Sequence, residues 1–440
     1  MRLKIPAGAG LIIQKLKERG FEAYVVGGCV RDRILGREPD DWDITTSASP
    51  YEVKQIFQRT VDTGLRHGTV TVLIGSRAFE VTTYRIDGEY EDGRHPKEVI
   101  FTRNLREDLS RRDFTINAMA YNDDEGLVDH FGGMADLSRH VIRCVGDPAE
   151  RFGEDALRIM RAVRFAAQLG FIIDGPTREA LAYLAPTLEK ISAERVQAEL
   201  VKLVTSAHPE YIGIAWETGI TGVVLPEFDA AAGIYQYTPH HMDTVGEHTL
   251  RALCAVPADR VLRLAVLLHD LGKAGTKKKD SEGVDHFPGH GEESARLAGQ
   301  ILRRLKFDNG TITKVVNLVR WHDIRYAAEP AAVRRMLSIT GREMFPLYME
   351  VQRADVLSQS EYRREEKLTK LSMIQRFYEE TLSAGYCTSL RELAVTGRDL
   401  TARGISAGPE LGKMLKSCLE LVLEEPKKNT KKELLGFLGL

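Results

Sequence analysis

The sequence predicts a multidomain α+β protein in which a mixed sheet with helices comes first and an all-α remainder follows. The chain has 440 residues, enough for about three domains of ~150 residues each. The first 140 residues alternate short β-rich runs with helical patterns. From about residue 141 the strand-like runs stop, and apolar residues recur with a helical period of about 3.6 residues.

The strands of the first part are predicted from runs of β-branched and aromatic residues bounded by Gly or Pro. These runs are AYVVGG (23–28), DWDITT (41–46), TVTVLIG (69–75) and AFEVTTYRI (78–86). Between the second and third runs, SPYEVKQIFQR predicts a helix in which Ser49 is the cap and Pro50 the first helical residue.

Composition and charge exclude several classes of protein. Hydrophobic residues make up 43% and charged residues 28% of the chain, which excludes wholesale disorder. Lys and Arg total 61 against 63 Asp and Glu, so the net charge of -2 does not by itself indicate a nucleic-acid or membrane partner. No apolar run approaches the about 20 residues of a spanning helix, and the five cysteines form no CxxC pair. We therefore expect a cytoplasmic protein with no membrane partner.

Two carboxylates, Asp41 and Asp43, lie two residues apart in the predicted strand 41–46. Alternate residues of a strand project from one face, so both would share a face while Trp42 points to the other. Carboxylate oxygens suit Mg²⁺, and a paired site can activate a hydroxyl and neutralise a pyrophosphate leaving group. An isolated Asp-x-Asp is more often a solvated strand edge, so the surrounding motifs decide the interpretation.

A Gly-Gly turn precedes these carboxylates. The segment 27–32, Gly-Gly-Cys-Val-Arg-Asp, follows a strand and opens a helical stretch. Glycines let backbone N–H groups approach a phosphate closely, and Arg31 would add guanidinium donors. A plain strand-to-helix turn is the alternative, but the ordered series GGCVRDRILG, DWDI and RRDFTINAMA favours a nucleotide site.

With these motifs the chain resembles the class II nucleotidyltransferases, the family of tRNA CCA-adding enzymes and bacterial poly(A) polymerases. The resemblance implies a polymerase-β-like nucleotidyltransferase head, in which Asp41 and Asp43 are catalytic and bind Mg²⁺. It also implies that Gly28, Arg31 and Arg112 contact the nucleotide. Glu80 is the candidate third carboxylate, with a structural cross-strand pairing as the alternative. The matching stretches are 27–46, 79–96, 108–121, 151–171 and 191–200.

A row of charged residues, Asp155, Arg158, Arg161 and Arg164, occurs at three-residue steps of a predicted helix. Such a row spirals around the helix, so Asp155 and Arg158 share a face, whereas Arg164 lies largely on another face. The alternative is a solvated row of ion pairs. In this family Asp155 and Arg158 resemble the protein template that reads the base, and the resemblance assigns Arg161 and Arg164 to the nucleotide as well.

One carboxylate acceptor and one guanidinium donor match the amine and the unprotonated ring nitrogen of both cytosine and adenine. Uracil and guanine would leave polar groups unpaired, which is a costly mismatch. We therefore expect CTP and ATP as substrates.

The stretch RIDGEYEDGRHPKEVIF (85–101) predicts a mobile loop between strands. Similar enzymes need such a loop to change from C addition to A addition, so its presence favours the complete CCA reaction. His95 stands where the family frequently has a second arginine before the proline, which weakens the match slightly. A poly(A) polymerase or A-adding enzyme of the same family is the alternative.

Histidines and aspartates between residues 240 and 360 occur in an order that resembles the HD phosphohydrolase superfamily. The resemblance implies a second divalent metal, with His248, His269, Asp270 and Asp355 as ligands, that activates water for phosphoester cleavage. A degenerate, purely structural domain is the alternative. Further members of the series are His290, His322 and Asp323, whereas His240 and His241 are expected to be loop residues.

The C-terminal stretch 395–438 resembles the tail of bacterial CCA-adding enzymes, and its lysines can contact RNA phosphates. An ordinary solvated helix is the alternative. These lysines are Lys413, Lys416, Lys427, Lys428, Lys431 and Lys432.

The sequence thus predicts four parts: a head (1–140), a helical neck with the base-selecting helix (141–230), an HD domain (231–365) and a helical tRNA-binding tail (366–440). The predicted activity is Mg²⁺-dependent addition of C, C and A to tRNA from CTP and ATP, with HD phosphohydrolase activity as a further hypothesis. Alternatives of other classes are an HD phosphohydrolase with an RNA-binding head and a non-enzymatic tRNA-binding protein. The oligomeric state is left open.

Overall fold

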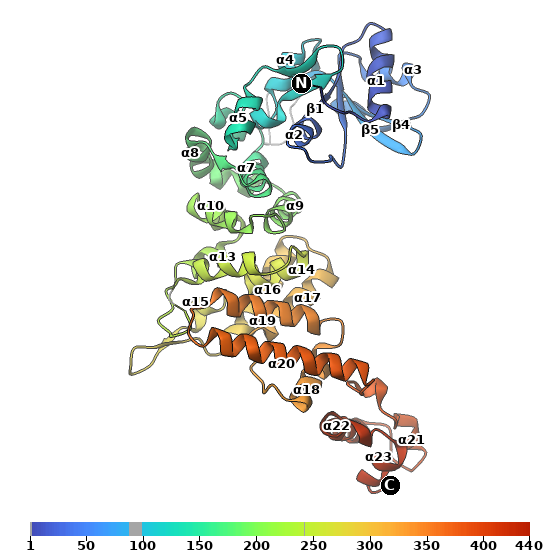
Figure 1. Cartoon of the computed structure of the whole chain (residues 1–440), viewed down its shortest axis with the longest axis vertical. Helices are drawn as coiled ribbons and strands as arrows, with labels where there is room; N and C mark the ends of the chain where they lie inside the picture. Colours follow the sequence, from blue (N-terminus) through green and yellow to red (C-terminus); the bar gives the residue numbers. More distant parts are fainter. Residues whose placement is uncertain (1, 88–98, 242) are drawn as a thin grey trace. The chain divides into compact units, whose positions relative to one another are not determined.

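The computed structural model describes residues 2–87, 99–241 and 243–440 and divides the chain into two compact units, 1–226 and 227–440 (Figure 1). The α+β fold class is confirmed, with the large sheet in the first unit and a second unit that is almost wholly helical. The four-part division stays a prediction. Residues 88–98, the centre of the predicted C-to-A loop with His95, lie outside the described residues.

A seven-stranded mixed sheet in the order β3-β4-β5-β2-β1-β8-β9 organises the first unit. Only β2 and β5 are parallel; the other neighbouring strands in this sheet are antiparallel. The strands are β1 (Ala23–Val26), β2 (Asp43–Thr46), β3 (Thr60–Gly64), β4 (Thr69–Ile74), β5 (Arg77–Thr83), β8 (Met119–Asn122) and β9 (Gly126–Asp129).

Helix α1 (Ala7–Glu18) buries Ile12 and Leu16 completely and contacts β1 and β2. The predicted helix after Ser49 is α3 (Pro50–Ile56), and its capping box is present. The other helices of this unit are α2 (Gly28–Ile34), α4 (Leu105–Ser110), α5 (Gly133–Arg139), α6 (Pro148–Glu154), α7 (Leu157–Leu169), α8 (Gly175–Leu184), α9 (Ala193–Val204), α10 (Ile212–Glu217) and α11 (Ile220–Val224).

Two strand predictions need correction. The run 41–46 is paired only from Asp43, where the register with β5 begins, so Asp41 precedes the strand. Strands also continue past residue 141, as the short parallel pair β10 (Val141–Ile142) and β11 (Ile172–Ile173) and the hairpin β12 (Lys278–Lys279) and β13 (Asp285–His286). Pieces of two residues leave no period in the sequence. A further antiparallel pair, β6 (Arg85–Asp87) and β7 (Val99–Phe101), flanks the loop region.

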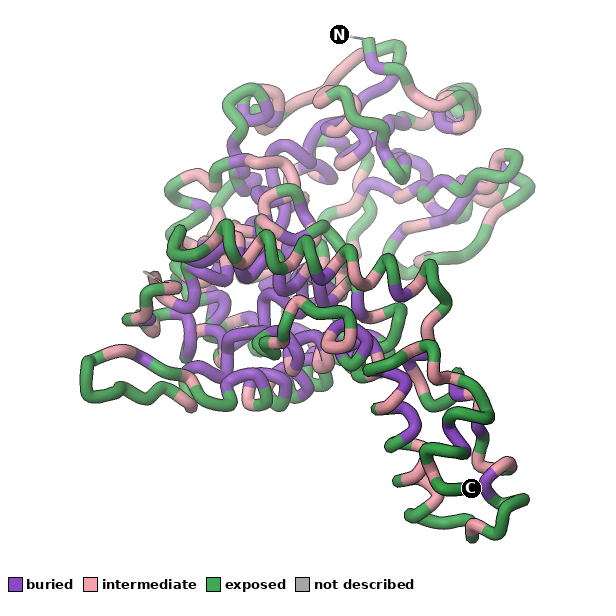
Figure 2. Tube along the Cα trace, turned by 60° about the horizontal axis from the view of Figure 1, so that its bottom comes forward, coloured by how far each residue is buried: buried purple, intermediate pink, exposed green. Residues whose placement is uncertain are grey.

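The second unit has a helical core followed by a smaller cluster near the C-terminus (Figure 2). In the cluster, α21 (Gly397–Thr401), α22 (Pro409–Glu424) and α23 (Lys431–Phe437) enclose fully buried residues that include Leu400, Cys418 and Leu434. The preceding helices are α12 (Pro226–Ala232), α13 (Val245–Ala255), α14 (Arg260–Leu268), α15 (Lys273–Thr276), α16 (His290–Arg304), α17 (Asn309–Trp321), α18 (Pro330–Thr340), α19 (Phe345–Ser358) and α20 (Arg364–Ser383).

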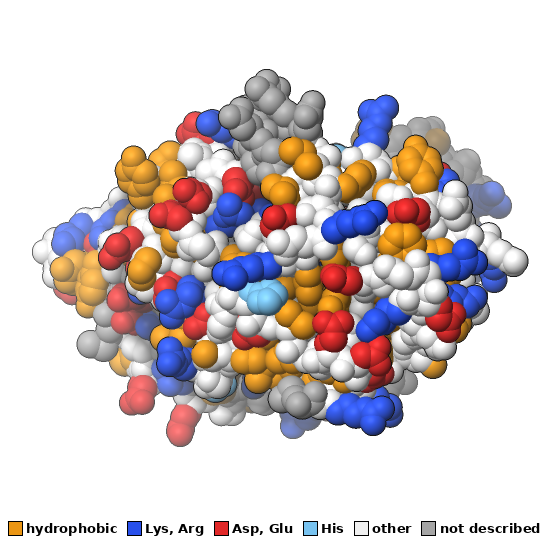
Figure 3. All heavy atoms as spheres, turned by 90° about the horizontal axis from the view of Figure 1, so that it is seen from above, with side chains coloured by type: hydrophobic (Ala, Val, Ile, Leu, Met, Phe, Trp, Pro, Cys, Tyr) orange, Lys and Arg blue, Asp and Glu red, His pale blue; other side chains and the backbone are white. Residues whose placement is uncertain are grey.

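The mixture of charges on the surface agrees with the net charge of -2. On the face shown in Figure 3, basic and acidic side chains are interspersed rather than gathered into one field. Within the described residues, no helix combines the length and the apolar character that crossing a bilayer requires.

Candidate functional sites

The carboxylates of the head lie where β2 begins. Asp43 opens β2 and is the register partner of Glu80 on β5, whereas Asp41 stands two residues earlier. Asp41 and Asp43 are exposed while Trp42 between them is buried, so the alternation of faces holds although the strand is shorter than predicted. Although the side chain of Asp43 is accessible, desolvation by the protein around it raises the pKa of its carboxyl, Arg112 opposes the rise, and the nearby charges of Glu80 and Asp41 add to it. Mutual repulsion of this kind is what a divalent cation relieves, so the residues present fit a metal.

Asp108 holds two arginines at the same site. Its carboxylate, on α4 and fully buried, lies 2.8 Å from Arg111 Nη2 and 3.7 Å from Arg112 Nη2, and it accepts a hydrogen bond from Thr45 on β2 at 3.0 Å. Burial opposes ionisation, but the two guanidinium groups and the hydrogen bonds outweigh it and lower the pKa of Asp108. A small cavity of about 160 Å³ is lined by Asp43, Glu80, Arg111 and Arg112, among others. Two carboxylates and these two arginines therefore line one cavity.

The Gly-Gly turn makes room for Arg112. Gly27 has φ of +83°, and a Cβ there would lie 2.9 Å from Arg112 Nη1, so a side chain is disfavoured both by conformation and by contact. Gly28 follows as the first residue of α2.

Buried polar groups join Arg31 of α2 to α7. Arg31 donates to Asn117 Oδ1 at 2.6 Å, and Asn117 donates to Asp113 Oδ1 at 3.1 Å. The other oxygen of Asp113 is 2.5 Å from Arg161 Nη2. Burial favours the neutral acid, yet Arg161 and the hydrogen bonds hold the pKa of Asp113 well below its usual range. The predicted nucleotide residues Arg31 and Arg161 thus belong to one network.

Phe165 of α7 is surrounded by guanidinium groups. Its ring centroid lies 5.0 Å from the Cζ atom of Arg31, 5.2 Å from that of Arg161 and 3.5 Å from that of Arg164. Arg164 also forms an ion pair with Glu199 of α9 at 2.7 Å. Three of the five arginines assigned to the nucleotide from sequence are therefore brought together around one aromatic ring.

The prediction that Asp155 lies on the same helix as Arg158 is wrong. Helix α6 ends at Glu154, Asp155 has extended φ and ψ of -141° and 102°, and α7 begins at Leu157. The Asp155 carboxylate accepts the Leu157 N–H at 3.1 Å and forms an ion pair with Arg195 of α9 at 2.7 Å. Side chains of this type compete with helix formation by bonding nearby backbone N–H groups, which explains the break.

Arg158, the predicted partner of Asp155, is paired with Glu154 at 2.6 Å. It also donates to two backbone carbonyl groups, that of Arg111 at 2.9 Å and that of Arg151 at 3.1 Å. The structure therefore gives each member of the proposed base-reading pair a separate partner, Arg195 for Asp155 and Glu154 for Arg158.

In the second unit, four histidine Nε2 atoms converge around Asp270. The Nε2 atom of His248 is 3.3 Å from that of His269, and the Nε2 atom of His290 is 3.1 Å from that of His322. His248 Nε2 also lies 3.1 Å from Asp355 Oδ1. In each of two groups, the possible metal-ligand atoms lie within 4.8 Å of one another: His248, His269 and Asp270, and Asp270, His290 and His322. The predicted four ligands are brought together, and His290 and His322 join them.

The opposite ring nitrogens fix the tautomers of these histidines. The Nδ1 atoms of His269, His290 and His322 lie 2.6–2.8 Å from the carbonyl oxygens of Val266, Phe287 and Val319, respectively. A carbonyl only accepts, so each Nδ1 carries the proton and each Nε2 presents a lone pair to the centre. Asp270 Oδ1 is buried, and none of the described residues donates a hydrogen bond to it. Facing lone pairs and an orphaned carboxylate oxygen fit divalent cations, with Asp270 shared between the two groups.

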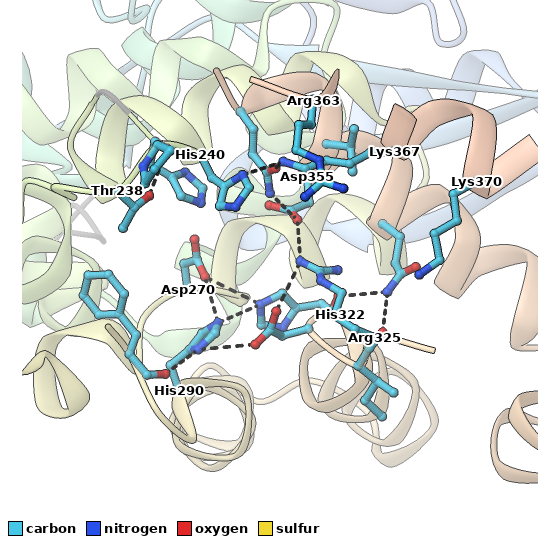
Figure 4. A pocket seen from close by; sticks show the side chains of 18 of the residues that line it. Thr238, His240, Asp270, His290, His322, Arg325, Asp355, Arg363, Lys367 and Lys370 are labelled. Atoms are coloured by element: carbon cyan, nitrogen blue, oxygen red, sulfur yellow. Dashed lines mark hydrogen bonds and ion pairs between the residues drawn. The ribbon is translucent and has the colours of Figure 1, made fainter. Parts of the chain in front are cut away.

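A cavity of about 690 Å³ opens beside this centre (Figure 4). His240 and His241 are loop residues, as predicted, but they also line the cavity, which the sequence did not indicate. The His241 ring centroid lies 4.7 Å from that of His248, and burial followed by repulsion from Lys273 lowers the pKa of His241 to about 2. His241 is therefore neutral beside the centre.

The six tail lysines are only partly committed to other side chains. Lys413 pairs with Glu410 at 3.8 Å, Lys428 with Glu425 at 2.7 Å and Lys431 with Asp399 at 2.7 Å. Ion pairs near the surface are weak, so these contacts do not prevent the lysines from binding phosphate. The role of the lysines in RNA binding stays a prediction.

Models of protein families match three stretches of the chain. They are "Poly A polymerase head domain" over residues 23–143, "Probable RNA and SrmB- binding site of polymerase A" over 170–232, and a model for tRNA nucleotidyltransferase domain 2 over 292–438. Together with a mixed sheet that presents carboxylates beside arginines, these matches define the class of protein as a nucleotidyltransferase.

Relatives that match over nearly the whole length identify the family. The CCA-adding enzyme of Lactiplantibacillus plantarum is 36% identical over 97% of this chain and 94% of its own, and that of Levilactobacillus brevis is 38% identical over 92% and 90%. The crystal structure of the Bacillus stearothermophilus CCA-adding enzyme in complex with CTP has a TM-score of 0.72 and 31% identity, covering 99% of this chain and 98% of that one. The chain belongs to the family of CCA-adding enzymes.

Proposed function

We propose that this protein adds C, C and A to the 3′ end of tRNA, using CTP and ATP and releasing pyrophosphate, in the cytoplasm. The observation that carries this function is the register pairing of Asp43 with Glu80 beside Arg112, in a chain that matches CCA-adding enzymes over nearly its full length. The Bacillus stearothermophilus relative was solved with CTP, and a Thermotoga maritima structure of the same fold was solved with tRNA.

Asp41, Asp43 and Glu80 would hold Mg²⁺ in the head. When bound, Mg²⁺ supplies the positive charge that favours an ionised attacking hydroxyl and a pyrophosphate leaving group. The tRNA 3′-oxygen forms the new bond to the α-phosphorus, the bond to the bridging oxygen of pyrophosphate breaks, and the hydroxyl proton is released. Arg112, placed against Gly27 and held by Asp108, binds and orients the triphosphate.

Base selection is assigned to Asp155 and Arg158, with Gly28, Arg31, Arg161 and Arg164 contacting the rest of the nucleotide. The ion pairs of Asp155 with Arg195 and of Arg158 with Glu154 support this assignment because they hold both side chains in place. A carboxylate acceptor and a guanidinium donor suit cytosine and adenine, as their amine and ring-nitrogen edges require.

The test uses a tRNA transcript that ends at the discriminator base, with CTP and ATP supplied singly and together. CTP alone should extend the transcript by two residues, and both nucleotides by three, after which growth stops. Long A tails would identify a poly(A) polymerase instead. Incorporation that survives in both Asp41→Ala and Asp43→Ala variants would contradict the mechanism.

We also propose a second activity, phosphoester hydrolysis at the HD centre, because the Nε2 atoms of four histidines converge around Asp270. The residues of the two groups, with Asp355, would hold two divalent cations. When bound, such cations supply an activated water and neutralise the phosphate. The water oxygen bonds to phosphorus, the ester P–O bond breaks, and the leaving oxygen takes up a proton. Lys273, 2.6 Å from Asp270, helps to keep this carboxylate ionised.

Hydrolysis is tested with p-nitrophenyl phosphate and adenosine 2′,3′-cyclic phosphate in Mg²⁺, Mn²⁺, Ni²⁺ or Co²⁺. Activity that disappears in Asp270→Asn but persists in Asp43→Ala would assign it to the second unit. Absence of hydrolysis with every metal and both substrates would reject the activity.

A further inference from the structure

Helix α20 presents a continuous stripe of residues to the cavity beside the histidine centre. Residues three and four apart share one face of a helix, and the lining residues from its N-terminal half follow this spacing. The end of the stripe nearer the helix N-terminus is charged, whereas its last turn is apolar, with Ile374 almost completely buried. The lining residues are Arg363, which immediately precedes the helix, and Glu366, Lys367, Lys370, Leu371 and Ile374 within it.

The cations of this stripe are not all neutralised. Lys367 Nζ donates to two neutral acceptors, Gln359 Oε1 at 2.5 Å and His240 Nδ1 at 2.9 Å. Neither Lys367 nor Lys370 forms an ion pair with any residue in the described part of the chain, whereas Arg363 pairs with Glu366. Burial lowers the pKa of Lys367, the Asp355 carboxylate opposes this decrease, and repulsion from arginines including Arg325 and Arg363 adds to it. Positive charge is therefore concentrated at this end of the cavity.

The basic end lies close to the histidine centre. Gln359 bridges the two, because its Nε2 atom donates to Asp355 Oδ2 at 2.9 Å while its Oε1 atom accepts from Lys367. Asp355 in turn lies 3.1 Å from His248. In Figure 4, Arg363 and Lys367 lie above Asp355, with Asp270 and His290 on the other side of the same cavity. A small ligand can therefore reach both.

We propose that this cavity binds a nucleotide carrying two anionic groups, one at the histidine centre and the other at Lys367 and Lys370, with its base against Leu371 and Ile374. This inference rests on the proposed HD phosphohydrolase and names its substrate class. A cavity of about 690 Å³ falls within the size range of small-molecule sites. A substrate with one phosphate and a neutral remainder would leave the lysine charges unpaired, whereas a bisphosphorylated nucleoside neutralises both ends.

The test compares adenosine 3′,5′-bisphosphate with adenosine 3′-monophosphate as substrates of the full chain loaded with Mn²⁺, with products separated by chromatography. The wild type should hydrolyse the bisphosphate with a kcat/KM about tenfold higher, a preference of the size that one charge-assisted contact gives. The Lys367→Met/Lys370→Met variant should lose this preference because its KM for the bisphosphate rises. Its efficiency with p-nitrophenyl phosphate, which has one anionic group, should fall by a smaller factor than its efficiency with the bisphosphate. Lys314→Met, on the exposed face of α17, is the matched control.

Equal efficiency with the two nucleotides in the wild type, or equal losses with both in the double variant, would overturn the second anionic site while leaving the hydrolase intact. If no substrate is hydrolysed, the proposed activity fails, and calorimetry with adenosine 3′,5′-bisphosphate still decides the binding site when saturating CTP occupies the head. Binding that weakens about tenfold in the double variant supports the site. Undetectable binding, or binding unchanged in the double variant, overturns it.

Discussion

Asp43 and Glu80 are the first register partners of the parallel pair of strands β2 and β5. Paired residues of neighbouring strands project from the same face, so this register places two carboxylates side by side at the edge of the small cavity. Like charges directly opposite one another destabilise a sheet. Here the two carboxylates repel each other, and the positive charge of Arg112 opposes the resulting rise in the pKa of Asp43. The pairing favours a metal-binding role for Glu80 over the structural alternative.

Glu80→Gln should therefore reduce nucleotide incorporation about 10²-fold, as loss of one electrostatic contact to a reacting group does, and raise the Mg²⁺ concentration needed for half-maximal rate. The amide keeps the shape of the side chain but removes its charge. Single-turnover incorporation of CMP, titrated with Mg²⁺, measures both effects. Asp62→Asn, an exposed carboxylate paired with Lys54 on the surface, is the control and should retain the wild-type Mg²⁺ dependence. A Glu80→Gln enzyme with normal Mg²⁺ dependence would leave Glu80 a structural residue.

Arg195 should influence base selection although it is not one of the two residues proposed to read the base. Its guanidinium holds Asp155 at 2.7 Å, where the chain is extended and the helix cannot orient the carboxylate. Arg195→Ala should reduce kcat/KM for CTP and ATP about tenfold and lower their preference over UTP and GTP, because a free carboxylate no longer rejects a carbonyl edge reliably.

The selectivity is measured as the ratio of kcat/KM for CTP to that for UTP on one tRNA transcript. Arg178→Ala is the matched control, since Arg178 of α8 pairs with the exposed Glu217. A general loss of structure would lower all four efficiencies by the same factor. An Arg195→Ala enzyme whose CTP:UTP ratio equals that of the wild type would show that Arg195 does not position Asp155.

Local signals in the sequence were sufficient where neighbouring residues determine the structure. Ser49 and Glu52 form the reciprocal capping box that opens α3, and Trp42 is buried between two exposed aspartates. Local signals did not predict which residues far apart in the sequence form pairs. Asp155 leaves the helix and pairs with a residue 40 positions later, which no periodicity shows.

The same limit applies to the second unit. The order of histidines and aspartates indicated the HD centre, but not that Asp270 is shared by two groups of ligands, which depends on how α13, α14, α16 and α17 pack. The predicted boundary at 365/366 falls inside α20, so Lys367 and Lys370 were assigned to the tail although they line the HD cavity. Spacing along one helix could have revealed the stripe, but not what it faces.

The ion pair of Asp113 with Arg161 should stabilise the first unit in a pH-dependent manner. Asp113→Asn removes the charge from a carboxyl that is 8% exposed, and Arg161, about one third exposed, is then left without its partner. We expect the free energy of unfolding at pH 7 to fall by about 2 kcal/mol, less than for a fully buried pair because water reaches Arg161. Urea denaturation measures the loss, and faster hydrogen exchange of the α7 amides in the variant would assign it to this unit.

The folded-state pKa of Asp113 lies below its unfolded value of about 3.9, so its contribution is complete above that value and is lost as the pH falls towards the folded pKa. The stability difference between wild type and Asp113→Asn should therefore be constant between about pH 5 and 7 and shrink below about pH 4. A difference that does not change with pH would show that Asp113 contributes by packing alone.

The two ligand groups around Asp270 predict the metal content of the second unit. In an Asp41→Ala/Asp43→Ala background, which weakens binding in the head, the full chain dialysed against Mn²⁺ should retain about two ions per chain. His322→Ala should retain about one, because the group of His248 and His269 stays intact, whereas Asp270→Asn should retain none, because both groups need that carboxylate. The exposed His130, on the loop after β9, gives the control variant His130→Ala. Elemental analysis counts the ions, and thermal denaturation follows binding independently, since a metal held only by the folded state raises Tm. Equal metal content in His322→Ala and wild type would show that His290 and His322 bind no ion, and the centre would then hold a single metal.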